Sequence, residues 1–378
     1  MSTTTATTVG LCLEPLDVLF FRDGRPFMSG TGPMVSGLPL PQTIVGAIRT
    51  ALLRLAGCDF GRLRQGIESG QSFAQAVTQA CLQKHHWIGQ MTVRGPWLAR
   101  RSQMEENLEV LVPAPAVLHK EKREGAARLE CLGPLPTGQL PGWSPPPDQQ
   151  GLRPLWLKER IVTEPAEGYL TRTGLEQFLR GDDLAADAVI PSSELLALDH
   201  RTGISIAPER LVAEESQIYG CGFLALKRDV FLYAEVVLPD DARTDSLFDQ
   251  ITTLPLGGEG RHALLHRLRK RFAWPGSHPQ RDKQKPLILL TTPCAFHAGW
   301  KPQALDGRLV AAAVPGPLAF SGWDLARCGP KPTRFAVPAG SVYFLESLPD
   351  NWQLGLAEND EDRQQGWGCC LTGVWTDE

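Results

Sequence analysis

The stretch VGLCLEPLDVLFFRDGRPF, from Val9 to Phe27, sets the expectation for the fold. Val9–Phe21 predicts a β-strand, and Pro15 within it indicates a bulge or an edge position, because proline cannot donate a hydrogen bond to a sheet ladder. The Asp-Gly pair that follows predicts a turn between Arg22 and Arg25. These two arginines either close an ordinary surface turn or face a polyanion, and the rest of the chain is needed to decide between the two interpretations.

A helix is predicted after this turn and a glycine-rich loop over Ser29–Gly37. It runs from about Gln42 to Ala56 and ends before Gly57. Its apolar residues recur with a helical period and predict packing on a sheet. The other face carries Thr43, Gly46, Arg49, Thr50 and Arg54. Glycine costs up to about 1 kcal/mol of helix propensity relative to alanine, so Gly46 indicates a close approach by another group.

Strand patterns dominate the remainder of the chain. Segments rich in β-branched and aromatic residues predict strands in GISIAP, QIYGCGFLALKRD, VFLYAEVVLP, LILLTT, RLVAAAV and SVYFLE. Thr173–Gly181 predicts a short helix, and the seven prolines and four glycines of residues 133–154 predict a loop. Residues 262–272 fit either a helix or a strand. Strands outnumber helices and both kinds interleave, which predicts an α+β fold with antiparallel sheets.

Composition limits the classes of function. The 378 residues are enough for two domains, and a net charge of −4 excludes a globally basic protein that coats nucleic acid, although a local basic groove remains possible. Nine cysteines without a C-x-x-C pair give no zinc or redox motif. The N-terminal residues lack the features of a secretory signal, and no apolar segment approaches the length of a membrane span. We therefore expect a cytoplasmic protein that does not associate with a membrane.

The loop GGEGRHA, Gly257–Ala263, is the strongest candidate for anion binding. It matches a degenerate dinucleotide fingerprint, but no parallel βαβ pattern surrounds it. Contiguous glycines expose backbone N–H groups, so Gly257, Gly258 and Gly260 with Arg261 fit a loop that cradles phosphates. A simple tight turn is the alternative.

A basic run follows the loop. Eight positive charges face a single acid, Asp282, from Arg261 to Lys285. The run includes Arg267, together with Phe272 and Trp274, which are candidates for stacking on bases. Nucleic acid becomes the leading partner class.

No catalytic or metal-binding set is evident. His262 and His266 have the spacing of zinc ligands on a helix, but Ala263 stands where a zincin has glutamate, and no third ligand is evident. There is no nucleophile elbow, P-loop or paired-carboxylate motif. We expect no cofactor and no metal.

Five blocks of sequence carry a resemblance to a known family. They are LEPLDVLFFRDGRPF, LPLPQTIVGAIRTALL, HRTGISIAPERLVAEESQIYG, LGGEGR and SGWDLARCGPKPTRFAVPAGSVYF, in this order from Leu13 to Phe344. Together they resemble the third-subunit family of the Cmr complex, the type III-B CRISPR effector, within the RAMP superfamily. The resemblance implies two ferredoxin-like (RRM-like) domains. We expect them at residues 1–275, with an insertion at about 100–195, and at 283–378.

The same resemblance implies a non-catalytic RNA-binding subunit. It would hold the 5′ handle of the CRISPR RNA (crRNA), contact the large polymerase-like subunit and the backbone RAMP subunit, and meet target RNA only indirectly. The predicted RNA contacts are Arg22, Arg25, Thr43, Gly46, Arg49, Gly257, Gly258, Gly260, Arg261 and Arg267. Trp323 and Tyr219 are expected in the core. The alternatives are an endoribonuclease that processes CRISPR precursor RNA, with His200 or His262 as acid or base, and the equivalent subunit of a Csm complex.

Overall fold

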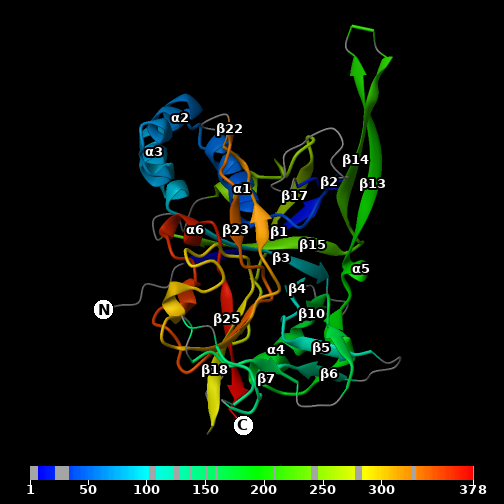
Figure 1. The fold of residues 1–378 in the computed structure, drawn as a ribbon. Helices are drawn as coiled ribbons and strands as arrows, with labels where there is room; N and C mark the ends of the chain where they lie inside the picture. The colour runs from blue at the N-terminus through cyan, green and yellow to red at the C-terminus, as the bar shows by residue number, and fades with distance from the viewer. Residues whose placement is uncertain are drawn as a thin grey trace. The chain divides into compact units, whose positions relative to one another are not determined.

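The computed structural model describes most of the chain. The described residues are 7–21, 34–101, 108–122, 128–136, 138–145, 147, 149, 151–157, 161–207, 209–210, 212–239, 246–276, 283–324 and 329–377. They form a mixed fold of short helices and mainly antiparallel strands (Figure 1), in agreement with the predicted α+β class. The chain divides into two compact units, each built from three separate segments. No helix in the described part of the chain is both long enough and apolar enough to cross a membrane.

The first unit contains residues 1–93, 195–271 and 319–334. Its helices are α1 (Pro41–Leu55), α2 (Phe60–Glu68), α3 (Phe73–Ala80), η1 (Gln83–Gly89) and η4 (Leu247–Gln250). Its strands are β1 (Thr7–Pro15), β2 (Met34–Val35), β13 (Leu196–Ala207), β14 (Val212–Leu226), β15 (Val230–Leu238), β16 (Thr253–Pro255), β17 (His262–Arg267), β21 (Trp323–Asp324) and β22 (Gly329–Pro330).

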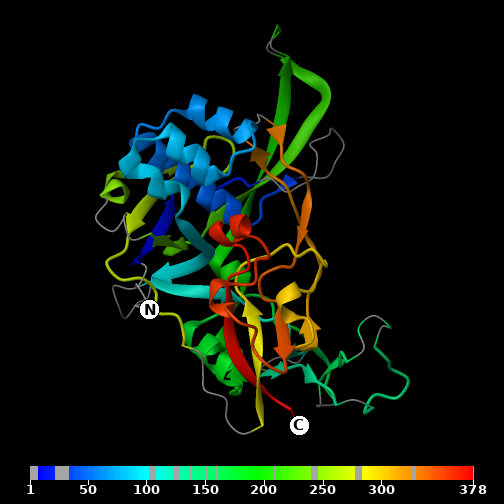
Figure 2. The same ribbon diagram turned by 90° about the vertical axis from the view of Figure 1, so that its left-hand side faces the viewer.

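Strand β1 lies between β15 and β17 in the sheet of the first unit, antiparallel to both. Its central residues Leu11 and Leu13 are fully buried. Strand β16 extends the sheet beyond β17, and α1 contacts both β16 and η4. Figure 2 shows α1, α2 and α3 grouped together in this unit. The open choice between helix and strand is settled by pairing for residues 262–267, which form β17 because β1 and β16 both bond to them.

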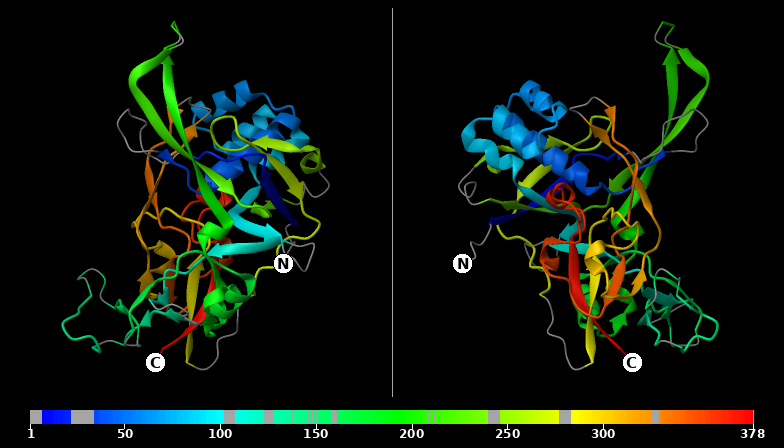
Figure 3. Two further views of the ribbon diagram at one scale, coloured as in Figure 1. Left: turned by 90° about the vertical axis from the view of Figure 1, so that its right-hand side faces the viewer. Right: turned by 60° about the vertical axis from the view of Figure 1, so that its left-hand side comes forward.

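A long hairpin is the most extended part of the first unit. Strands β13 and β14 pair along most of their length, with a register shift between Ile204 and Ile206. Figure 3 shows this hairpin reaching away from the sheet and helices of its unit. At the base of the hairpin, Met34 and Val35 of β2 pair in parallel with Cys221 and Gly222 of β14.

The second unit contains residues 94–194, 272–318 and 335–378. Its strands are β4 (Leu108–Pro113), β5 (Leu118–Glu121), β6 (Arg128–Cys131), β7 (Gly133–Pro134), β8 (Leu155–Trp156), β9 (Thr163–Pro165), β10 (Tyr169–Leu170), β11 (Leu184–Ala185), β12 (Val189–Ile190), β18 (Gln284–Leu290), β19 (Leu309–Ala313), β24 (Val342–Leu345) and β25 (Cys370–Thr376). Its helices are α4 (Arg172–Arg180), α6 (Asp360–Gln364), η2 (Ala186–Ala188), η5 (Gln303–Leu305) and η6 (Trp352–Leu354). The unit boundaries fall at or within β3 (Thr92–Arg101), α5 (Ser192–Leu195), β20 (Leu318–Phe320) and β23 (Arg334–Ala336).

These units differ from the predicted domains. The segment expected as an insertion in the first domain groups instead with the C-terminal residues. The physical reason is a shared core, in which Val112, Leu170 and Phe178 pack with Phe344 and Trp375. Helix α4 lies on β25 so closely that a Cβ on Gly373 would be 2.8 Å from the backbone of Leu179.

Most local predictions agree with the structure, but the strand predicted over Val9–Phe21 is shorter, because β1 ends at Pro15, which has no N–H to continue the ladder. Helix α1 is within one residue of its predicted bounds, and α4 ends at Gly181, whose φ of +72° is left-handed. The predicted strands appear as β13, β14, β15, β18, β19 and β24. The predicted loop at 133–154 contains the short strand β7, which pairs with β8 immediately after it.

Candidate nucleic-acid interface

The glycine-rich loop packs directly against the residues that precede Arg22. The backbone N–H of Gly258 donates a hydrogen bond to the carbonyl oxygen of Phe20 (2.8 Å). Gly257 has a φ of +83°, and a Cβ at this position would lie 2.5 Å from the same carbonyl oxygen. Only glycine fits such a position, so the loop sequence and the Leu19–Phe21 segment are sterically matched.

The base of the hairpin lies at the same place. Leu19 and Leu224 exchange backbone hydrogen bonds of 2.8 Å, and the Phe21 N–H donates to Ser36 Oγ (2.9 Å). Ser36 in turn donates its backbone N–H to Gly222 (2.8 Å). Three segments that are distant in sequence therefore converge within the first unit. Arg22 and Arg25 lie outside the described residues, but Arg22 follows Phe21 directly in the chain.

Two arginines flank one buried ring at this convergence. The guanidinium carbon atoms of Arg201 and Arg261 lie 4.8 and 4.9 Å from the Phe223 ring centroid, and Phe20 contacts the same ring at 5.0 Å. Their positive charge is partly balanced, because Arg261 pairs with Asp17 and Arg201 with Asp199, both at 2.6 Å. Arg261 thus lies where the glycine-rich loop meets the base of the hairpin.

The charge on Asp17 is stabilised by its surroundings. A hydrogen bond from the Val18 backbone, with the nearby Arg261 and Arg201, holds the pKa of the Asp17 carboxyl below its ordinary value. Burial raises the pKa of the Cys221 thiol, and the negative charge of Glu259 on the loop raises it further. The surface therefore contains acids as well as bases.

Sequence reasoning missed Arg201. The residue is exposed on β13, and the strand register places it opposite Cys221, beside Phe223. Its one available signal was its position in the HRTGIS block that carries the family resemblance. The register between β13 and β14 was needed to bring it to the loop.

The predicted contacts on α1 separate into two kinds. Gly46 is exposed, and no described atom of the chain outside its own helix lies within 4 Å of the position that a Cβ would take. Thr43 is half-buried in the first turn of the helix. Arg49, by contrast, is only 8% exposed: its Nη2 donates to the Met91 carbonyl oxygen (3.1 Å), and its guanidinium lies 4.6 Å from the Phe73 ring centroid. These contacts give Arg49 a packing role within the first unit.

The basic run is not one continuous surface. Arg267 lies opposite Leu11, at the end of β17 away from the loop, and pairs with Asp249 (3.2 Å). Lys285 belongs to an ion-pair network with Glu346 and Asp377. Arg281 and Asp282 lie outside the described residues.

The two aromatic residues of this run do not form an open stacking platform. Phe272 is only 6% exposed, and Trp274 packs edge-on against Phe272 and Trp97 at ring-centroid distances of 4.9 and 4.7 Å. Both rings contribute to packing in the second unit.

The histidines form no metal centre in the described part of the chain. His262 and His266 are on a strand, not a helix, and His266 Nε2 lies 3.0 Å from Glu14. No group of three histidine, cysteine, aspartate or glutamate side chains among the described residues is arranged to hold a metal ion. His200 is exposed on β13, and its pairing partner in the register is Gly222.

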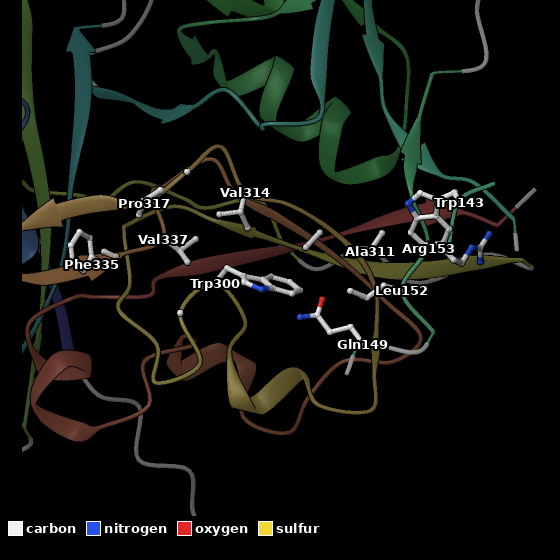
Figure 4. Close-up of a pocket in the computed structure, with 14 residues that line it drawn as sticks. Trp143, Gln149, Leu152, Arg153, Trp300, Ala311, Val314, Pro317, Phe335 and Val337 are labelled. Atoms are coloured by element: carbon white, nitrogen blue, oxygen red, sulfur yellow. The ribbon is translucent and has the colours of Figure 1, made fainter. Parts of the chain in front are cut away.

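The second unit contains an apolar pocket of about 580 Å³ (Figure 4). Trp300 lies in its middle, with the Gln149 amide turned toward the indole and Trp143 and Phe335 near opposite ends. Arg153 also lines it, but its guanidinium is held by Asp377 (2.7 Å) and the Leu135 carbonyl oxygen (3.0 Å). The pocket offers mainly apolar contact.

The described residues define an α+β protein of mainly antiparallel sheets, with a glycine-rich loop and two arginines beside one phenylalanine ring. Residues 11–375 match the family of the CRISPR-associated protein (Cas_Cmr3), and the chain belongs to this family. It is therefore a subunit of the Cmr complex, the type III-B CRISPR effector.

Several solved structures resemble the chain. Two are subunits of the type III-B Cmr-beta complex bound to cognate target RNA, one of them also with AMPPnP. The chain from the structure with AMPPnP is 16% identical over 89% of this chain and 86% of its own, with a TM-score of 0.49. The chain from the other structure is 17% identical over the same shares, with a TM-score of 0.48. A chain of the Csm3–Csm4 subcomplex from a type III-A interference complex is 11% identical over 90% of this chain and 97% of its own, with a TM-score of 0.40. No curated protein matches the chain significantly.

Proposed function

We propose that this chain is the non-catalytic subunit that holds the 5′ handle of the crRNA and bridges the large subunit to the backbone of the complex. The observation that carries the proposal is the convergence of the Leu19–Phe21 segment, the Gly257–Arg261 loop and the base of the β13–β14 hairpin. Single-stranded RNA is commonly held by arginines and backbone N–H groups at its phosphates, while its bases splay out and stack. The convergence brings Arg201 and Arg261 to the glycine-rich loop, in which the Gly258 N–H is bonded to Phe20 and holds the loop in place.

The proposal includes two ferredoxin-like domains. In the second unit the sheet order is β19-β24-β18-β25. Strand β18, the first of the four in sequence, therefore lies between β24, the third, and β25, the last. Helical segments η5 and α6 stand at the two helix positions of a β-α-β-β-α-β order. In the first unit β1 likewise lies between β15 and β17, with α1 following β1.

The test is to sequence the 5′ ends of the RNA that co-purifies with the assembled complex. The wild-type complex should yield a uniform repeat-derived 5′ tag. An Arg22→Gln, Arg25→Gln, Arg261→Gln variant should lose this tag while the complex stays assembled. Its crRNA affinity should also depend less steeply on salt, by about one unit of slope for each phosphate contact removed.

Retention of the tag by the triple variant, with unchanged salt dependence, would contradict the handle-binding role and leave a bridging role alone. The absence of catalysis has its own test. His200→Ala should leave processing of the precursor RNA unchanged, and loss of processing in this variant would restore the endoribonuclease alternative.

A further inference from the structure

Trp323 is a large aromatic residue that the fold leaves exposed. The sequence places it among expected core residues, but its exposed fraction is 60% in the structure. It lies on β21, in a short hairpin where it pairs with Pro330 of β22. An indole held open on a structured hairpin is available to a binding partner.

The hairpin is anchored to the first turn of α1. Gln42 Nε2 donates to the Ser321 carbonyl oxygen (2.7 Å), and a Cβ on Gly322 would lie 3.0 Å from the same nitrogen. Two hydrogen bonds close the hairpin. Ser321 Oγ donates to the Lys331 carbonyl oxygen (2.7 Å), and the Lys331 N–H donates to the Gly322 carbonyl oxygen (2.8 Å). Figure 1 shows β22 beside α1. Trp323 is thus fixed near the part of α1 that contains Thr43 and Gly46.

Cations accompany the indole on this ribbon. The guanidinium of Arg334 lies 5.5 Å from the Phe320 ring centroid, and Arg334 is exposed. Lys331 follows Pro330, the residue opposite Trp323, and its Cδ lies 3.7 Å from the position of a Cβ on Gly322, while Asp324 directly follows Trp323. An exposed aromatic ring with basic neighbours matches the stacking and charge requirements of single-stranded RNA.

We infer that Trp323 is a stacking platform for an unpaired nucleobase of the crRNA, with Lys331 and Arg334 on the same ribbon for the adjoining phosphates. This inference rests on the proposed function and extends its RNA-binding surface from the glycine-rich loop to the β21–β22 hairpin. The anchoring of the hairpin to the first turn of α1, which contains the predicted RNA contact Thr43, favours RNA over a protein partner.

The test uses reconstituted Cmr complexes that carry Trp323→Ala or Trp323→Phe, with Trp156→Ala as the matched control. Trp156 is also exposed, at 49%, but lies on β8 in the second unit. Stacking of one base is worth about 1–3 kcal/mol, so Trp323→Ala should weaken crRNA binding about fivefold or more. Trp323→Phe should retain most of the affinity, and Trp156→Ala should match the wild type.

Ultraviolet cross-linking separates this inference from the proposed function. The expected result is a crRNA adduct on the peptide that contains Trp323, lost in Trp323→Ala. Unchanged affinity and no such adduct, while other segments of the chain still cross-link to the handle, would overturn the inference and leave the proposed function intact. Release of a protein subunit by Trp323→Ala with unchanged RNA affinity would also overturn it. No cross-link from any part of the wild-type chain to the handle would contradict the proposed function itself.

Discussion

The backbone N–H of Gly258 and the carbonyl oxygen of Phe20 are joined by a hydrogen bond of 2.8 Å. This bond ties the glycine-rich loop to the residue that precedes Phe21 and the RDGR sequence. Two segments that were proposed separately as RNA contacts therefore belong to one surface, as far as the described residues extend. The surface also includes Arg201 and Arg261, whose guanidinium carbon atoms lie 4.8 and 4.9 Å from the centroid of the Phe223 ring.

The loop glycines should differ sharply in their tolerance of alanine. Gly257→Ala should destabilise the protein by about 2–4 kcal/mol, because a left-handed φ and a clash with Phe20 combine. Gly260 also has a left-handed φ, of +63°, but open space around it, so Gly260→Ala should cost only about 1 kcal/mol. Urea unfolding of both variants measures the difference. Equal costs would show that the close approach to Phe20 is not a constraint in solution.

Gly46 tests whether a partner approaches α1. Gly46→Ala should stabilise the isolated protein by about 0.5–1 kcal/mol, because the position is exposed and helical. Gly46→Trp should leave the fold intact and weaken crRNA binding at least tenfold by blocking the approach. Arg54→Trp, at another exposed position about 12 Å further along the helix, is the control and should bind normally. Normal binding by Gly46→Trp would remove Gly46 from the interface.

Asp17 should restrain the RNA affinity of the loop. The carboxylate lies 2.6 Å from Arg261, so Asp17→Asn removes a negative charge where phosphate is proposed to bind. We expect crRNA binding to tighten about two- to fivefold at low salt, in line with the strength of an exposed ion pair. Filter binding over a range of salt concentrations measures the change. If Arg261 serves only to anchor Asp17, the substitution will leave RNA affinity unchanged.

Arg267 provides the comparison for Arg261. It forms a similar exposed pair with Asp249, at the opposite end of β17. Asp249→Asn should therefore affect RNA binding less than Asp17→Asn does. An equal effect would extend the interface along β17, as the sequence predicts for Arg267.

Arg49 should matter for stability before it matters for RNA. Its buried guanidinium bonds to the Met91 carbonyl oxygen, so Arg49→Ala should destabilise the protein by about 2–4 kcal/mol. Arg54→Ala, at an exposed position on the same helix, should change stability by less than about 0.5 kcal/mol. Thermal unfolding distinguishes them. A stable Arg49→Ala protein that had lost RNA binding would restore the predicted RNA contact.

Asp377 should make stability fall in acid. Hydrogen bonds from Arg153 and Lys285 lower the pKa of the Asp377 carboxyl to about 2 in the folded protein. A pKa depressed on folding contributes stability that is present above about pH 4 and lost as the pH falls toward 2; here it is about 2 kcal/mol. Asp377→Asn should remove this contribution and flatten the pH dependence over that range.

The sequence by itself determined the local elements and the family. Helix α1 and helix α4 follow from apolar periodicity and from the residues at their ends, and most strands follow from β-branched runs, because these signals act over a few neighbouring residues. The predicted anion-binding loop is indeed a turn with left-handed glycines. The family blocks reflect the same local information, read in order along the chain.

Only the tertiary structure decided where these elements meet. Residues 262–272 have no local preference between helix and strand, and pairing with β1 and β16 makes residues 262–267 a strand. The insertion joins the C-terminal segment because their apolar faces bury one another, and no local pattern encodes that choice. Burial of a side chain depends on which residues distant in sequence pack against it. Arg49 is buried because Met91 and Phe73 pack against it, whereas the described residues leave Trp323 60% exposed.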